Sequence, residues 1–159
     1  LRDAVVLEMK RAFGERFGLF GHGWSEFLRG HGIEHVEQTV PLARAHEVYW
    51  RSKIGLSVSL ANFLDCYTSD RLLRVLGCGT LLLVKRFPLM SVLGLRDGIN
   101  CIVFDNACSA VSLASEAAIN SQPYSQIALA GASLAAVHHA WDVRMFELAE
   151  YITAVRASR

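Results

Sequence analysis

The alternation of apolar and polar residues predicts several short strands. Residues 54–61 (IGLSVSLA) alternate strictly, so that the larger apolar side chains face one way and the small Gly and Ser residues face the other. Small residues on that second face allow a helix or a ligand to approach the strand closely. Residues 80–86 (TLLLVKR) begin as a continuous apolar run, which is typical of a strand inside a parallel sheet. Strands are also predicted at 16–24 (RFGLFGHGW), 33–40 (IEHVEQTV) and 100–105 (NCIVFD).

Helical periodicity separates these strands and fills the end of the chain. Asp105 or Asn106 can cap one helix, and Pro123 can open the next. Strands that alternate with helices imply βαβ units and a parallel sheet. We therefore predict one α/β domain over residues 1–159, a Rossmann-like fold of three layers. Its helices are expected at 4–13, 42–53, 69–77, 107–119, 123–140 and 142–157, with a loop and one helical turn between 87 and 98.

Composition narrows the class of protein. The chain has 159 residues, of which 52% are hydrophobic, so it can bury a core and is not disordered. Its formal net charge of +1 argues against bulk attraction to nucleic acid or anionic lipid, so any anion site must be local. No apolar run reaches the length of a membrane span. The chain begins with Leu1 and shows no leader, so we expect it to be a piece of a longer protein.

Cysteines and histidines do not form a recognisable metal pattern. Cys66, Cys78, Cys101 and Cys108 contain no C-x-x-C pair, and we interpret them as reduced thiols of a cytoplasmic protein rather than disulfides. The adjacent residues His138 and His139 would point about 100° apart on a helix, which is a poor arrangement for one ion. We expect no metal site.

A glycine turn follows the first predicted strand. In an open parallel sheet, ligands bind beyond the carboxyl ends of the strands. Gly21 and Gly23, with His22 between them, could bring backbone N–H groups to a phosphate, although such a turn is as often only a tight turn. The dinucleotide fingerprint is incomplete because Glu26 stands where it needs a glycine, so NAD and FAD are discounted.

A second candidate begins at Ser69. Arg71 would lie in the first turn of a helix, where the helix dipole disfavours a cation, so a diphosphate held by its guanidinium would be a suitable partner. In the alternative, Asp70 and Arg74 pair on the helix surface, for about 0.3–0.5 kcal/mol, and Arg71 is solvated. The sequence leaves both open. Gly79 is interpreted as a helix C-cap in preference to a ligand contact.

The chain resembles the carboxyl-terminal half of GT-B glycosyltransferases, most closely the CgeB-like group. The resemblance lies in residues 49–86, in Asp97-Gly98 and Phe104-Asp105, and in a late His139-x-Trp141-x-x-Arg144. The resemblance implies two Rossmann-like domains facing each other, of which the carboxyl-terminal one binds a nucleotide-diphosphate sugar without a metal. It implies that Arg71 contacts the diphosphate, with the Gly21–Gly23 turn opposite. The amino-terminal, acceptor-binding domain would be missing from this chain.

One residue departs from that pattern. Many GT-B relatives carry Glu at the place of Arg74, where the carboxylate accepts hydrogen bonds from the ribose, and arginine cannot accept them. Three classes therefore remain: a glycosyltransferase domain, a non-catalytic binding or scaffold domain that has lost the donor, and a receiver-like or flavodoxin-like signalling module. No acidic pair follows the first predicted strand, which argues against a receiver. Catalytic residues are not assigned, and an isolated half could self-associate through an exposed apolar face.

Overall fold

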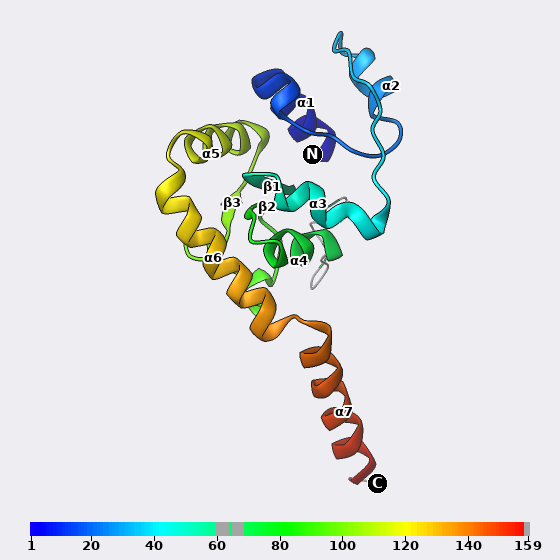
Figure 1. Cartoon of the computed structure of the whole chain (residues 1–159), viewed down its shortest axis with the longest axis vertical. Helices are drawn as coiled ribbons and strands as arrows, with labels where there is room; N and C mark the ends of the chain where they lie inside the picture. The colour runs from blue at the N-terminus through cyan, green and yellow to red at the C-terminus, as the bar shows by residue number, and fades with distance from the viewer. Residues whose placement is uncertain (60–63, 65–68, 158–159) are drawn as a thin grey trace.

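The computed structural model describes residues 1–59, 64 and 69–157 (Figure 1). Its strands are β1 (Ile54–Ser57), β2 (Leu81–Lys85) and β3 (Ile102–Phe104). Short 3-10 turns occur at η1 (Gly14–Arg16), η2 (Leu42–Arg44) and η3 (Met90–Leu93). The α-helices are α1 (Arg2–Phe13), α2 (Trp24–Arg29), α3 (Ala45–Trp50), α4 (Asp70–Gly77), α5 (Ala107–Ile119), α6 (Ser121–His138) and α7 (Trp141–Ala157).

The three described strands form one parallel sheet in the order β1-β2-β3. Leu83 in the central strand lies opposite Leu56 on one side and Ile102 on the other. The apolar run that predicted β2 is therefore explained by its position between two neighbours. The prediction of an α/β fold with a parallel sheet is confirmed.

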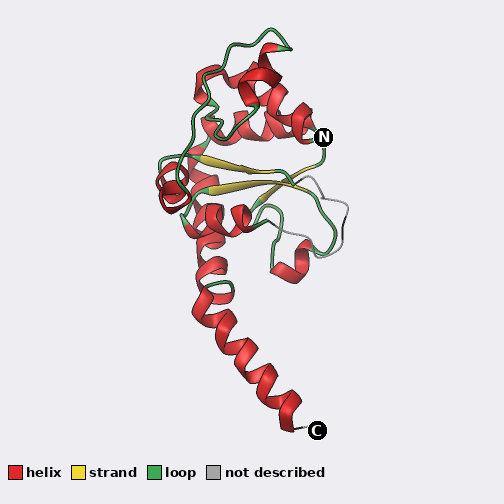
Figure 2. Ribbon diagram, turned by 90° about the vertical axis from the view of Figure 1, so that its right-hand side faces the viewer, coloured by secondary structure: helices red, strands yellow, loops and turns green. Residues whose placement is uncertain are grey.

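Side chains of β2 alternate between two cores, one on each face of the sheet. Leu81 and Leu83 pack in the core that α1 and α5 cover, whereas Leu82 and Val84 pack against α4. Figure 2 shows helices above and below the strands, so the predicted three layers are present. The small face of β1 is the one that α4 approaches: a methyl group added to Gly55 would lie 2.5 Å from Cγ1 of Val75.

Two predicted strands are wrong. Residues 16–24 contain the end of η1, an irregular stretch and the start of α2, and residues 33–40 form no strand. Gly21 and Gly23 have φ angles of +120° and +85°, which interrupt the extended backbone that a strand needs. The two segments meet through a hydrogen bond from the N–H of Gly21 to the carbonyl of Gln38, 2.9 Å long.

Helix ends are mostly where the sequence places them. Asn106 caps α5, and its side chain and that of Ser109 form a reciprocal capping box. The helix α6 begins at Ser121, two residues before the predicted opening at Pro123. The helix predicted at 42–53 is shorter in the structure than in the prediction. It consists of η2 followed by α3 and ends at Trp50. The predicted strand at 54–61 extends beyond the described residues, and β1 ends at Ser57.

The last helix, α7, has no buried residue and extends away from the sheet (Figures 1 and 2). A short chain of hydrogen bonds fixes its base. Arg144 Nη2 lies 2.7 Å from His139 Nδ1, and His139 Nε2 lies 2.9 Å from the carbonyl of Leu93. Since a guanidinium can only donate, Nδ1 accepts and Nε2 carries the proton that it donates to Leu93. Arg144 also pairs with Glu147 at 2.8 Å.

Candidate functional site

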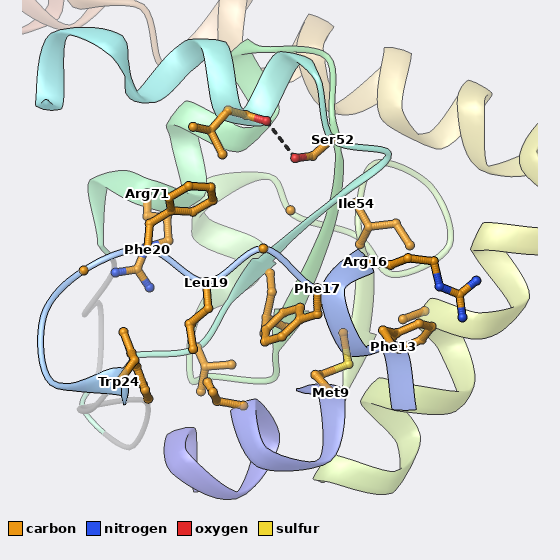
Figure 3. A pocket seen from close by; sticks show the side chains of 18 of the residues that line it. Met9, Phe13, Arg16, Phe17, Leu19, Phe20, Trp24, Ser52, Ile54 and Arg71 are labelled. Carbon is orange, nitrogen blue, oxygen red and sulfur yellow. Dashed lines mark hydrogen bonds between the residues drawn. The ribbon is translucent and has the colours of Figure 1, made fainter. Parts of the chain in front are cut away.

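A pocket of about 1000 Å³ lies against the outer side of β1. Within the described sheet β1 pairs only with β2, so its other edge is open to the pocket. The remaining walls come from α1, α3 and α5, from the irregular segment around Gly21 with the following α2, and from the first turn of α4. Figure 3 shows side chains from these elements pointing toward one another across this space.

Four of the predicted site residues line this one pocket: Gly21, His22, Gly23 and Arg71. The fold therefore brings together two segments that are far apart in the sequence. Arg71 lies beside Phe20 at one side of the pocket (Figure 3). Within the described residues no ion pair joins Arg71 to a carboxylate. Its charge is available to a ligand.

The glycine turn is already occupied by groups of the chain itself. The N–H of Gly23 donates to the carboxylate of Glu37, and the ring of His22 lies 3.6 Å from the other oxygen of that carboxylate. The hydrogen bond from Gly23 holds the pKa of Glu37 below its usual value. The N–H of Gly21 donates to Gln38. The turn therefore faces the pocket, but its two glycine N–H groups are not free for a phosphate.

The other predicted residues lie outside the walls of the pocket. Arg74 pairs with Asp70 at 2.9 Å, which is the surface pair that the sequence left open. Ser69 precedes α4 as its N-cap residue. Most of the preceding polar loop, 60–63 and 65–68, lies outside the described residues.

Gly79 ends α4 instead of contacting the pocket. Its φ is +69°, and it donates its N–H to the carbonyl of Leu76 while Thr80 donates to Val75. This is the Schellman arrangement, in which a glycine in the left-handed conformation satisfies the last carbonyl groups of a helix. The interpretation of Gly79 as a C-cap agrees with this geometry.

Positive charge is concentrated in the pocket. Among the described residues, five basic side chains line it against one carboxylate, that of Asp3, which pairs with Arg2 at 3.2 Å. Most of these cations were not among the site residues predicted from the sequence. A usable signal was the run R-S-K directly before a strand, in which two basic residues flank a serine. The basic residues are Arg2, Arg16, Arg51, Lys53 and Arg71.

Two of these cations, Arg71 and Arg16, lie at opposite sides of the pocket with apolar side chains between them. In Figure 3, Arg71 with Phe20 and Trp24 lies on one side, and Arg16 with Phe13 lies on the other. We call these the Arg71 end and the Arg16 end. Arg2 stacks over Trp24, with the guanidinium carbon 5.1 Å from the ring centre. The apolar walls between the two ends include Met9, Phe17, Leu19, Ile54 and Leu56.

Metal-binding clusters and membrane-spanning helices are both absent from the described residues. These residues contain no group of three or more His, Cys, Asp or Glu side chains placed to hold a metal ion. None of the described helices is long and apolar enough to cross a membrane. The described cysteines, Cys78, Cys101 and Cys108, are free thiols.

Comparison with known proteins gives one family and one fold. Residues 2–150 match the protein family described as "Glycosyl transferase-like". The structure is similar to that of Anabaena Alr3699/HepE in complex with UDP, with a TM-score of 0.62, 11% identity, and coverage of 81% of this chain and 34% of that one. For the same protein in complex with UDP-glucose the values are 0.65, 13%, 81% and 35%. The chain thus spans about a third of these relatives. No curated protein matches it.

Proposed function

Since the chain belongs to the glycosyl transferase-like family, we propose that its pocket binds the nucleotide-diphosphate sugar donor of a glycosyl transfer reaction. The observation that carries the proposal is the excess of cations in the pocket of a chain whose net charge is only +1. A diphosphate is the part of such a donor that needs positive charge, most of all when the bond to the sugar breaks.

Arg71 is the group that we assign to the diphosphate. It lines the pocket from the first turn of α4 and has no carboxylate partner within the described residues. A guanidinium can hold two phosphate oxygens through parallel hydrogen bonds, and backbone N–H groups of the helix start add partial positive charge. In this proposal the Gly21–Gly23 turn lies across the diphosphate from Arg71, and the carboxylate of Glu37 leaves the N–H of Gly23 when the donor binds.

The neighbouring aromatic residues suit the rest of the nucleotide. Phe20 and Trp24 lie at the Arg71 end of the pocket (Figure 3). Aromatic faces bind bases by stacking, irrespective of the base. The structures of Anabaena Alr3699/HepE, which has a similar fold, contain UDP or UDP-glucose, so a uridine nucleotide is the first ligand to test.

The finer parts of the proposal concern the whole protein. We propose transfer without a metal ion, a facing amino-terminal domain that binds the acceptor, and a CgeB-like relationship. The chain spans about a third of its solved relatives, which leaves room for such a domain. We also propose a cytoplasmic location, which suits the free thiols. Catalytic residues remain unassigned.

Calorimetric titration with UDP and UDP-glucose tests the proposal. We expect the chain to bind at least one of them, and Arg71→Gln to weaken that binding at least tenfold. Arg74→Gln is the matched control, because it removes the same charge from the same helix outside the pocket. At a hundred times its Kd, a ligand adds about 2.7 kcal/mol of stability, so a rise in Tm provides a second measurement.

The same titration decides between the two functions left by the sequence. If UDP, GDP, ADP and their sugars all fail to bind, also with the partner domain present, the donor proposal is wrong and the result favours a non-catalytic binding or scaffold domain. If Arg74→Gln weakens binding as much as Arg71→Gln does, Arg71 is not the diphosphate contact.

A further inference from the structure

The pocket has cations that the donor proposal does not use. Arg16 lies across the pocket from Arg71 (Figure 3). Arg51 and Lys53 line the same pocket and flank Ser52 in the chain. Besides Arg71, three positive groups from two segments therefore line this pocket.

These cations are not neutralised by neighbouring carboxylates. Within the described residues neither Arg16, Arg51 nor Lys53 forms an ion pair. Glu15, next to Arg16 in the chain, is bound to Lys10 at 2.9 Å.

The carboxylate nearest to Arg51 is committed elsewhere. Glu47 accepts two hydrogen bonds of 2.9 Å from Arg44, and these bonds are the main cause of its lowered pKa. Arg51 lowers that pKa further through its charge alone. Arg51 thus remains in the pocket lining without a carboxylate partner among the described residues.

The surface next to these cations is apolar. Phe13 lies under Arg16, with the guanidinium carbon 5.9 Å from the ring centre, and Phe17 and Ile54 continue the wall. A small, fully hydrated anion would gain nothing from such a wall. An anionic group attached to an apolar one would bury its apolar part there and keep its charge on the guanidinium groups.

We propose that the Arg16 end is a second anion site, which receives a phosphate or carboxylate of the acceptor next to an apolar part of that molecule. The inference rests on the proposed function, because the donor is assigned to the Arg71 end. The volume of about 1000 Å³ is at the upper limit of single-ligand pockets, in keeping with two ligands side by side. The rest of the acceptor lies outside the pocket.

Phenyl phosphate is the probe, because it joins a phosphate to an apolar ring. It is titrated calorimetrically into the free chain and into the chain saturated with UDP. We expect binding in both cases, with Kd values within threefold, and at least fivefold weaker binding of inorganic phosphate. The double variant Arg16→Gln/Arg51→Gln should weaken phenyl phosphate at least tenfold and UDP less than threefold.

A second double variant controls for charge. Arg29→Gln/Arg96→Gln removes two exposed arginines outside the pocket, neither of which forms an ion pair within the described residues, and should leave both affinities unchanged. Circular dichroism and Tm show whether each variant is folded.

Three results would overturn the inference. They are competition between phenyl phosphate and UDP for one site, unchanged phenyl phosphate binding in Arg16→Gln/Arg51→Gln, and inorganic phosphate binding as tightly as phenyl phosphate. Failure of the proposed function looks different, because then UDP does not bind at all. The Arg16→Gln/Arg51→Gln comparison on the free chain still decides whether this anion site exists.

Discussion

Arg71 and Arg74 show how one helical turn separates two roles. Both extend from α4, but Arg71 lines the pocket while Arg74 pairs with Asp70 at 2.9 Å. Residues three apart leave a helix on nearly the same side, so the difference lies along the axis: Arg71 belongs to the first turn, which lines the pocket, and Arg74 lies one turn further on. The sequence could identify both arginines as candidates, and only the structure separates them.

Two glycines near the end of α4 give a matched test of backbone conformation. Gly79 has a φ of +69°, whereas Gly77 lies within the helix and a methyl group added there would contact nothing within 4 Å. We expect Gly79→Ala to lower the free energy of unfolding by about 1–2 kcal/mol. Gly77→Ala should instead raise it by about 0.5 kcal/mol. Urea denaturation measures both, and equal effects would contradict the C-cap assignment.

Burial predicts different reactivity for two cysteines. Burial raises the pKa of the Cys101 thiol to about 12, whereas Cys108 is exposed on α5. We expect iodoacetamide at pH 8.5 to label Cys108 and leave Cys101 unmodified in the folded chain, as read by peptide mass spectrometry. Labelling in urea, where both should react, is the control.

The raised pKa of Cys101 also makes the free energy of unfolding depend on pH. Because the folded state holds the Cys101 proton more tightly than the unfolded state, the contribution of this thiol to stability is fully present below its unfolded pKa of about 8.5. The contribution is lost as the pH rises toward 12. Labelling of Cys101 as fast as Cys108 in the native chain would show that the thiol is not buried.

At the scale of elements, the sequence predicted those that have partners on both sides. The strand β2 is apolar from Leu81 to Val84 because it is central, and α5 carries its own capping box in Asn106 and Ser109. The patterns at 16–24 and 33–40 were misleading, since alternation shows what a strand would look like but not whether it finds an edge to pair with. Glycines with positive φ decided against pairing there.

The site was predictable to a similar degree. Motifs indicated the Gly21–Gly23 turn and Arg71, and the fold places them in one pocket. Arg16 carries no spacing signal, and Arg51 and Lys53 show only as the run R-S-K before β1, because the three line one pocket only through the packing of α1 and η1 beside β1. Occupation of the turn by Glu37 depends on a contact between segments that no local pattern encodes.

The helix α7 allows a prediction about stability. None of its residues is buried, and its described links to the body include the hydrogen bond from Arg144 to His139. We expect removal of residues 141–159 to lower the free energy of unfolding by less than about 1 kcal/mol, or about 2–4 °C in Tm. Removal of 121–159 is the control, because α6 buries Ala128, Gly131 and Ala135 and its loss should prevent folding. Calorimetry of both truncated chains measures this, and a large effect of the shorter deletion would contradict it.

At the scale of the molecule, charge and apolar surface are separated. The cations gather beside β1, while large apolar side chains are exposed along α7, including Trp141 at 83%, Phe146 at 65% and Tyr151 at 68%. Self-association through an apolar face stays a prediction, and sedimentation velocity over a range of concentrations tests it.

The hydrogen bonds of His139 also set a mechanical property. A helix of 17 residues is about 25 Å long, so a small change of angle at the junction with α6 moves the far end of α7 by several ångströms. A tilt of about 10° at this junction moves the carboxyl-terminal end of α7 by roughly 4 Å, given that length. The two bonds made by one imidazole, to Leu93 and to Arg144, therefore help to set the direction of α7 up to Ala157.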